Sequence, residues 1–156
     1  MEASRPVESR EYPSRPIVGV GGVVIEEGHA LLIRRGSPPL QGEWSIPGGK
    51  LEVGETLVEG VQRELLEETG LEVRVLGLIE VFERIFPDSS GRAQYHFVIV
   101  DYLCETVSGT PRPGGDSTDI ARVREEDLEN YSLTPAATRV LKKAFSMSRA
   151  AGPVEN

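Results

Sequence analysis

The segment Gly49–Leu71 has the sequence GKLEVGETLVEGVQRELLEETGL, and it predicts the element on which the rest of the fold depends. Apolar residues recur within Leu57–Thr69 at the 3.6-residue spacing of an amphipathic helix. Thr56 and Glu59 have the spacing of a capping box, and Gly70 suits the left-handed turn that ends such a helix. We therefore expect one short helix with well-defined ends.

One side of this helix carries three carboxylates, Glu64, Glu67 and Glu68, at spacing i, i+3, i+4. At ~6 Å, each like-charged pair repels by ~0.7 kcal/mol in water and by about 3 kcal/mol at an effective dielectric constant of 20. Local stability does not favour this arrangement, whereas a hard divalent cation does, because Mg²⁺ prefers oxygen ligands. The alternative interpretation is a solvated acidic face, and the helix alone leaves both open.

The loop before the helix contains Pro47-Gly48-Gly49, in which adjacent glycines allow close approach of the backbone to another element. Most such triplets merely reverse the chain, but the combination with the helix is specific. Gly49 is followed by five residues, Glu55, seven residues and then Arg63-Glu64-Leu65-Leu66-Glu67-Glu68-Thr69-Gly70-Leu71. Every fixed position of the Nudix box is matched, so the chain resembles a Nudix hydrolase.

The resemblance implies the Nudix fold, an α/β domain in which a mixed β-sheet lies between helices (α/β/α), over residues 17–146. The patterning is compatible with this fold, since β-branched and apolar runs alternate with the helix described above. Residues 1–16 are interpreted as a flexible N-terminal segment and residues 147–156 as a C-terminal tail. The expected strands are Ile17–Ile25, Ala30–Ile33, Val73–Phe86 and His96–Glu105, and the expected closing helix is Pro135–Phe145, with Thr134 as its N-cap.

The resemblance also implies a metal site and a reaction. Glu64, Glu67, Glu68 and the backbone carbonyl of Gly48 would bind Mg²⁺, with Mn²⁺ as a substitute. The implied reaction is hydrolysis of a phosphoanhydride bond in a nucleoside diphosphate linked to another moiety. Cations at the two phosphates would offset the negative charge of the substrate, which an acidic protein cannot do with its own net field.

The carboxylate that accepts the proton of the attacking water is expected within the box, at Glu67 or Glu64. Asp116 and Asp119, in the segment Gly114–Asp119, are later candidates for this role and for substrate binding. Their alternative interpretation is that of acids that keep an exposed loop soluble.

Three further residues are candidates for substrate contacts. Arg35 ends a predicted strand and could approach a phosphate, although simple solvent exposure explains it equally well. Trp44, the only tryptophan, could stack on a base or pack the loop onto the core. Gly49 lies between these positions and the helix.

Other box residues are expected to be structural, namely Glu55, Arg63 and Gly70. By its spacing, Arg63 faces away from the three carboxylates and can reach Glu59 or Glu55. The resemblance implies that it ties the loop to the helix through a charge-assisted hydrogen bond.

Composition excludes several other classes of protein. The 156 residues suit one domain, and 25 acidic against 17 basic residues give a formal charge of −8. This charge argues against binding to nucleic acid or to anionic lipid, and no apolar run approaches the ~18 residues of a membrane span. The single Cys104 excludes a disulfide framework. With no signal-peptide pattern at the N-terminus, a cytoplasmic location is expected.

The substrate is less well defined than the reaction. Pro87 lies sixteen residues after Leu71, a placement that resembles ADP-ribose pyrophosphatases, so ADP-ribose, giving AMP and ribose 5-phosphate, is the first choice. The alternative is a MutT-like pyrophosphohydrolase of (d)NTPs that releases pyrophosphate. A non-catalytic nucleotide sensor and an RNA-end hydrolase are less favoured. A homodimer in which residues 1–16 reach over the partner is also expected.

Overall fold

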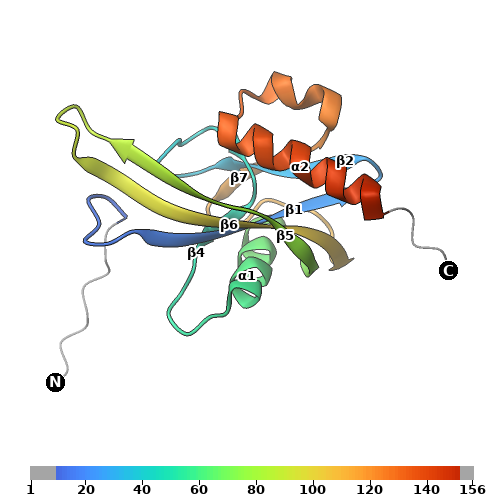
Figure 1. The fold of residues 1–156 in the computed structure, drawn as a ribbon. Coiled ribbons are helices and arrows are strands. Elements are labelled where there is room, and N and C mark those ends of the chain that lie inside the picture. The colour runs from blue at the N-terminus through green and yellow to red at the C-terminus, as the bar shows by residue number, and fades with distance from the viewer. Residues whose placement is uncertain (1–9, 152–156) are drawn as a thin grey trace.

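The structure, a computed structural model, describes residues 10–151 (Figure 1). Every element expected from the sequence is present, and several short ones are added. The elements in chain order are β1 (Ile17–Glu26), β2 (His29–Arg35), β3 (Trp44–Ser45), β4 (Gly48–Lys50), α1 (Leu57–Thr69), β5 (Glu72–Pro87), β6 (Ala93–Ser108), β7 (Ser117–Arg124), the 3₁₀ helix η1 (Glu125–Tyr131) and α2 (Pro135–Ala151).

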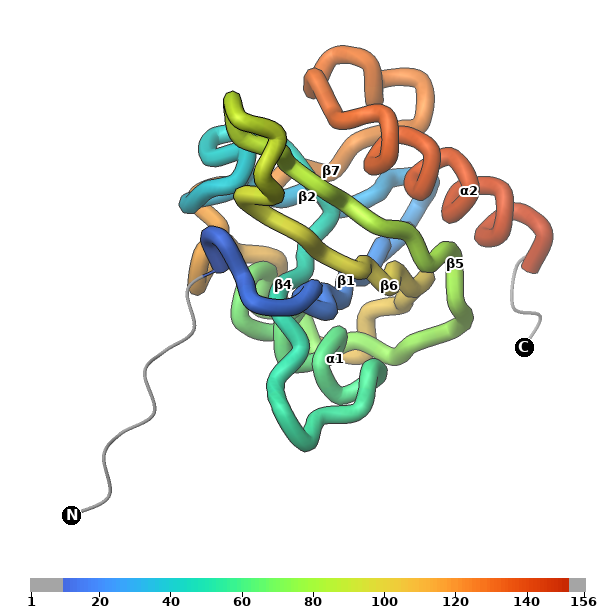
Figure 2. The backbone as a smooth tube through the Cα atoms, turned by 60° about the vertical axis from the view of Figure 1, so that its left-hand side comes forward, coloured from blue at the N-terminus to red at the C-terminus, as the bar shows by residue number. Residues whose placement is uncertain are grey.

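The strands form a mixed sheet with the order β3-β2-β1-β6-β5, in which β4 also pairs with β1 and β7 with β2. The pair β1–β6 is parallel and the other pairs are antiparallel. Helix α1 lies on one face of the sheet and α2 on the other, as Figures 1 and 2 show. The predicted α/β/α arrangement is confirmed.

Each face of the sheet is covered by the apolar stripe of one helix. On the α1 face, Val61 and Leu65 are fully buried and pack with Val20 and Val100. On the α2 face, the helix contributes its own buried residues to a second cluster that includes Val23. Successive side chains of a strand point to opposite faces of the sheet. The cluster to which a strand residue belongs therefore shows which face its side chain is on. The residues of α2 in that cluster are Val140, Leu141, Ala144 and Phe145.

Helix α1 begins and ends where the sequence predicts. The Thr56 hydroxyl accepts a hydrogen bond from the backbone N–H of Glu59 at 3.1 Å. Gly70 has a φ of +73°, and its N–H donates to the carbonyl of Leu66 at 3.0 Å. Because both ends are capped, the position of the glutamates along the helix is well defined.

Some predicted boundaries are wrong. Helix α2 continues to Ala151, beyond the predicted end at Phe145 and into the segment interpreted as a tail. Within the predicted N-terminal segment, the Tyr12 N–H donates to the Gln94 carbonyl at 2.7 Å and the Tyr12 hydroxyl donates to Asp88 at 2.9 Å. Residues 1–9 of the predicted N-terminal segment lie outside the described residues. Among residues 10–151, none of the helices has the length and apolarity that a membrane crossing needs.

Candidate functional site

A cavity of about 250 Å³ opens between the end of α1, strand β4 and the α2 face of the sheet. Its volume is slightly below the range of about 300–1,000 Å³ that is usual for small-molecule sites. Eight residues singled out in the sequence line it, which are Arg35, Trp44, Gly48, Gly49, Glu64, Glu67, Glu68 and Asp116.

Asp119 is not among the lining residues. It belongs to strand β7, where it pairs with Arg34 of β2, and its carboxylate accepts a hydrogen bond from the N–H of Ile120 at 2.8 Å. The expectation that it shares an irregular loop with Asp116 is wrong, because the strand starts at Ser117.

The three glutamates differ in exposure. Glu64 and Glu68 are buried, at 9% and 6% exposed, whereas half of the Glu67 side chain is exposed. Burial raises the pKa of Glu64, and it raises that of Glu68 to about 8 despite a hydrogen bond from the N–H of Gly48 at 3.0 Å. A carboxylate with this environment is stabilised by a cation, which removes the cost of its buried charge.

Gly49 lets strand β4 lie directly against α1. A Cβ atom at this position would be 2.6 Å from the carboxyl carbon and both carboxyl oxygens of Glu64. Any side chain would therefore displace the Glu64 carboxylate from the cavity wall.

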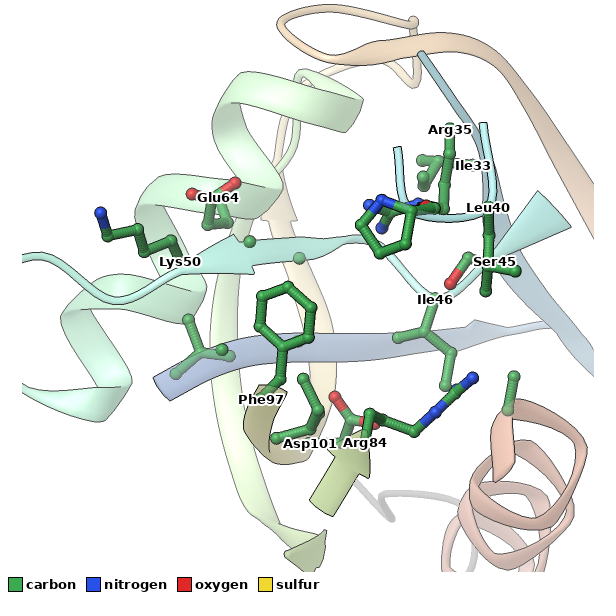
Figure 3. A pocket seen from close by; sticks show the side chains of 18 of the residues that line it. Ile33, Arg35, Leu40, Ser45, Ile46, Lys50, Glu64, Arg84, Phe97 and Asp101 are labelled. Carbon is green, nitrogen blue, oxygen red and sulfur yellow. Dashed lines mark hydrogen bonds between the residues drawn. The ribbon is translucent and has the colours of Figure 1, made fainter. Parts of the chain in front are cut away.

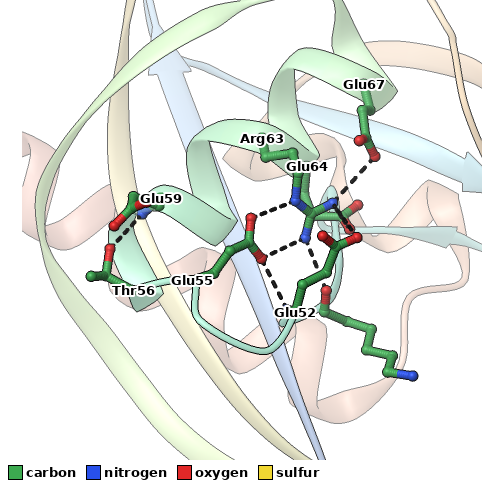
Figure 4. Close-up of polar contacts among 8 residues, drawn as sticks. Glu52, Glu55, Thr56, Glu59, Arg63, Glu64 and Glu67 are labelled. Atoms are coloured by element: carbon green, nitrogen blue, oxygen red, sulfur yellow. Dashed lines mark hydrogen bonds and ion pairs between the residues drawn. The ribbon is translucent and has the colours of Figure 1, made fainter.

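Arg63 joins the loop before α1 to the helix itself (Figure 4). Its Nε and Nη2 donate to the two oxygens of Glu55 at 2.5 and 2.9 Å, and Nη2 also donates to the Lys50 carbonyl at 3.0 Å. Such paired charge-assisted bonds are strong. They hold the pKa of Glu55 at about 2 and raise that of Arg63.

The same guanidinium also contacts the acidic cluster, contrary to the expectation that it faces away. Its Nη1 donates to Glu64 at 2.8 Å and to Glu67 at 3.4 Å. Glu67 is four residues after Arg63, a spacing that in fact places both side chains on the same side of the helix. Glu64 is the next residue in the chain, and the long Arg63 side chain reaches it by extending along the helix. The expected alternative, Glu59, caps the helix through its N–H.

The donor set of the cavity fits a hard divalent cation. Its three glutamates offer only oxygen ligands, and two of them are buried with raised pKa values. Within residues 10–151, no three acidic, His or Cys side chains already converge as a metal-binding group. Glu64 and Glu67 are instead held by Arg63, and Glu68 by Gly48.

On the other side of the cavity, Arg35 has no carboxylate within ion-pair distance among the described residues. Its Nε donates to the Pro39 carbonyl at 2.7 Å, and burial lowers its pKa. Trp44 lines the cavity and also packs edge-on against Tyr131, with 5.4 Å between ring centroids. Asp116 accepts a hydrogen bond from Ser37 at 2.5 Å.

Sequence reasoning missed a third part of the cavity, on strands β5 and β6 (Figure 3). Arg84 and Asp101 lie here beside the aromatic wall, which we define as Phe82, Phe86 and Phe97. Strand alternation was the available signal, because it places Phe97 and Asp101 on the same face of one strand. The sequence does not show that this face borders the cavity, because that depends on how the strands pair in the sheet.

A model of the NUDIX domain matches residues 15–145, which is most of the chain. The chain belongs to the NUDIX family. The predicted family is thereby confirmed, and the box residues described above lie within the matched range.

The NUDIX relatives carry several names. An "ADP-ribose pyrophosphatase" of Methanocaldococcus jannaschii is 35% identical over 104 residues, which is 67% of this chain and 59% of that protein. A "MutT-like protein" of Streptomyces ambofaciens is 31% identical over 138 residues, covering 88% of this chain and 82% of the relative. A crystal structure described as a MutT NUDIX hydrolase from Burkholderia pseudomallei has a TM-score of 0.73 and 31% identity, covering 83% of this chain and 98% of its own.

Proposed function

We propose that this NUDIX protein hydrolyses a phosphoanhydride bond in a nucleoside diphosphate linked to another moiety, with ADP-ribose as the substrate and AMP and ribose 5-phosphate as the products. The observation that carries the proposal is one cavity with an acidic end at Glu64, Glu67 and Glu68, an aromatic wall, and the guanidinium of Arg35, which forms no ion pair among the described residues. The name of the M. jannaschii relative supports the choice of substrate.

The three glutamates, with the backbone at Gly48, would hold Mg²⁺ or Mn²⁺. When bound, such a cation supplies charge neutralisation at the two phosphates and makes water more acidic. Arg35 would then bind a phosphate oxygen, because burial without a carboxylate partner leaves its charge available to an anion. Arg84, which contacts Thr134 at 3.4 Å, is a second such cation in the cavity.

We assign the proton-accepting role to Glu67. Its side chain is 52% exposed and is therefore accessible to water. The hydrogen bond that Glu67 accepts from Arg63 is long, at 3.4 Å, whereas Glu64 accepts one from Arg63 at 2.8 Å and Glu68 accepts one from Gly48 at 3.0 Å. In the reaction, the water oxygen forms a bond to one phosphorus as the bond from that phosphorus to the bridging oxygen breaks. The proton of the water passes to Glu67, and the bridging oxygen leaves with the second phosphate.

The test is product analysis with ADP-ribose and with nucleoside triphosphates in the presence of Mg²⁺. The proposal predicts AMP without free pyrophosphate from ADP-ribose, and a loss of about 10²–10⁴ in kcat for Glu67→Gln. Glu129→Gln, at an exposed position of η1, is the matched control and should keep full activity. No AMP from ADP-ribose would contradict the choice of substrate.

The second candidate is a pyrophosphohydrolase of (d)NTPs. The names of the S. ambofaciens relative and of the B. pseudomallei structure favour it, since both alignments cover most of the two chains. Release of pyrophosphate together with a nucleoside monophosphate would identify this activity. Nucleotide binding without any turnover would instead indicate a sensor.

We also propose a homodimer and a cytoplasmic location, both of which stay predictions from the sequence. Most of the segment expected to reach over the partner, residues 1–9, lies outside the described residues. Size-exclusion chromatography with light scattering tests the dimer directly, and a monomer at micromolar concentration would contradict it.

A further inference from the structure

Asp101, in the middle of strand β6, is a buried carboxylate for which the proposed reaction has no role. It is 3% exposed and lines the cavity. Among the described residues it has neither a hydrogen bond nor an ion pair. Burial, with a smaller contribution from the nearby Glu80, raises its pKa to about 7. An unpaired buried carboxylate destabilises a fold, so this residue calls for a partner that the protein itself does not supply.

The neighbouring strand is shaped to let this carboxylate reach the cavity. Gly21 of β1 is the register partner of Asp101, and a Cβ atom there would be 2.3 Å from Asp101 Oδ1. The carboxylate therefore occupies the space above β1 that any side chain at position 21 would fill. Phe97 lies on the same face of β6 and belongs to the aromatic wall. Figure 3 shows Phe97, Asp101 and Arg84 in one group, apart from Glu64.

The backbone of Asp101 lies two strands away from that of Gly48, at the acidic end. The register aligns Asp101 of β6, Gly21 of β1 and Gly48 of β4 in one row across three strands. Two strand spacings separate Asp101 from Gly48, which is roughly 10 Å. Glu80, and not a glutamate of α1, is the carboxylate that contributes to the raised pKa of Asp101.

We propose that Asp101 is a specificity-determining residue that accepts a hydrogen bond from the nucleoside part of the substrate. This inference rests on the proposed function, in which the diphosphate lies against the glutamates and the nucleoside extends toward the aromatic wall. The donor is an N–H of the base amino group or an O–H of the ribose, since both are donors that a carboxylate pairs with. The apolar surroundings at Phe97 suit a base ring.

The experiment measures nucleotide binding to the full chain by calorimetry in Mg²⁺, without any chemical step. The ligands are AMP, the analogue with hydrogen in place of the 6-amino group, and 2′,3′-dideoxy-AMP. We expect AMP to bind about 10- to 100-fold more tightly than the analogue that lacks the donor, the usual effect of a hydrogen bond to a charged group. A lower affinity of the 6-hydrogen analogue alone identifies the base as the source, and a lower affinity of the dideoxy analogue alone identifies the ribose.

The variants Asp101→Leu and Asp101→Asn test whether this residue makes the difference. In Asp101→Leu the affinity ratio should fall to about one, whereas the amide oxygen of Asp101→Asn should retain part of it. Asp127→Asn, exposed in η1, is the control and should keep the full ratio. Thermal unfolding checks the fold, and both variants should be at least as stable as the parent, because each removes an unpaired buried charge.

The inference is overturned if the ratio is unchanged in Asp101→Leu, or if the parent chain binds no AMP at millimolar concentration. Its failure is distinguishable from that of the proposed function. If the ratio of AMP affinity to analogue affinity depends on Asp101 but the protein leaves ADP-ribose intact, only the proposed substrate is contradicted. Cleavage of ADP-ribose with an Asp101-independent ratio would contradict only this inference.

Discussion

At the scale of single residues, the cavity combines carboxylates with quite different environments. Glu55 is held ionised by Arg63, with a pKa of about 2, while burial raises the pKa of Glu68 to about 8. The first carboxylate stabilises the folded protein and the second destabilises it whenever it is ionised. A destabilising buried carboxylate such as Glu68 is retained where a ligand binds to it. Substitution of Glu68 and removal of the Arg63 partner of Glu55 should therefore change stability in opposite directions.

Glu68→Gln should raise the stability of the metal-free protein and remove its response to Mg²⁺. The amide oxygen can still accept the hydrogen bond from Gly48, while the buried charge is lost. At pH 8.5 we expect a gain of about 1 kcal/mol or more, which corresponds to ~2–4 °C in Tm. Differential scanning calorimetry with and without Mg²⁺ measures both effects. A lower Tm in the metal-free variant would show that Glu68 has a structural role instead.

Arg63→Ala should lower both stability and activity, because it removes two charge-assisted bonds to Glu55 and leaves the Lys50 carbonyl without its donor. The expected loss is about 1–3 kcal/mol in the free energy of unfolding. Arg63→Lys is the matched variant, and it should recover little, since an ammonium group cannot form the paired contact. Urea unfolding measures the change. Unaltered stability with reduced activity would contradict the structural assignment of Arg63.

At the scale of elements, the sequence predicts α1 with its caps and the long strands because periodicity and capping residues act locally. It does not predict β4 or β7. Gly48–Lys50 has no strand propensity of its own and is extended because it pairs with Gly19–Gly21 of β1. Ser117–Arg124 pairs with β2, and that pairing moves Asp119 away from the cavity.

The site shows the same division between local and tertiary information. The spacing of Glu64, Glu67 and Glu68 is a property of one helix and could be read directly. Asp101 depends on which face of β6 meets the cavity, and that is decided by the parallel pairing with β1. The contact of Arg63 with Glu67 follows from their i,i+4 spacing, whereas its contact with Glu64 depends on side-chain directions that spacing does not give.

Gly49→Ala tests the close approach of β4 to α1. The added Cβ would be 2.6 Å from the Glu64 carboxyl atoms, so this carboxylate must move. We expect a drop of at least tenfold in kcat/KM in Mg²⁺, with a modest loss of stability, since overpacking costs about 1–3 kcal/mol. Gly77→Ala is the control, because among residues 10–151 its Cβ would meet only Met147 Cε, at the ordinary distance of 3.9 Å. Equal activity of the two variants would refute the close packing of Gly49 as a requirement of the site.

At the scale of the whole molecule, both faces of the sheet contribute to one cavity. The glutamates come from α1, while Asp101 and the aromatic wall lie on the face covered by α2. Gly19 and Gly21 of β1 lie between these two groups, and side chains there would clash with Ile99 and Asp101. The acidic end and the aromatic wall therefore lie on either side of β1, whose glycines leave the space between them open.

Metal binding should be linked to pH through this acidic end. The folded-state pKa of Glu68, about 8, lies above the ordinary value of 4.5, so the folded protein holds an extra proton between these pH values. Stability of the metal-free protein should therefore fall as the pH rises from about 5 to 8. Because Mg²⁺ requires the ionised carboxylate, it competes with this proton, and its stabilising effect should be larger at pH 8.5 than at pH 6.

Thermal unfolding at both pH values, with and without about 10 mM Mg²⁺, measures this linkage. NaCl of the same ionic strength is the control, because salt alone screens repulsion in a chain with a formal charge of −8. Glu68→Gln should abolish the difference between the two pH values. An equal rise in Tm at pH 6 and pH 8.5, or the same rise with NaCl, would mean that the cation does not bind at the buried glutamates and acts only on the surface charge.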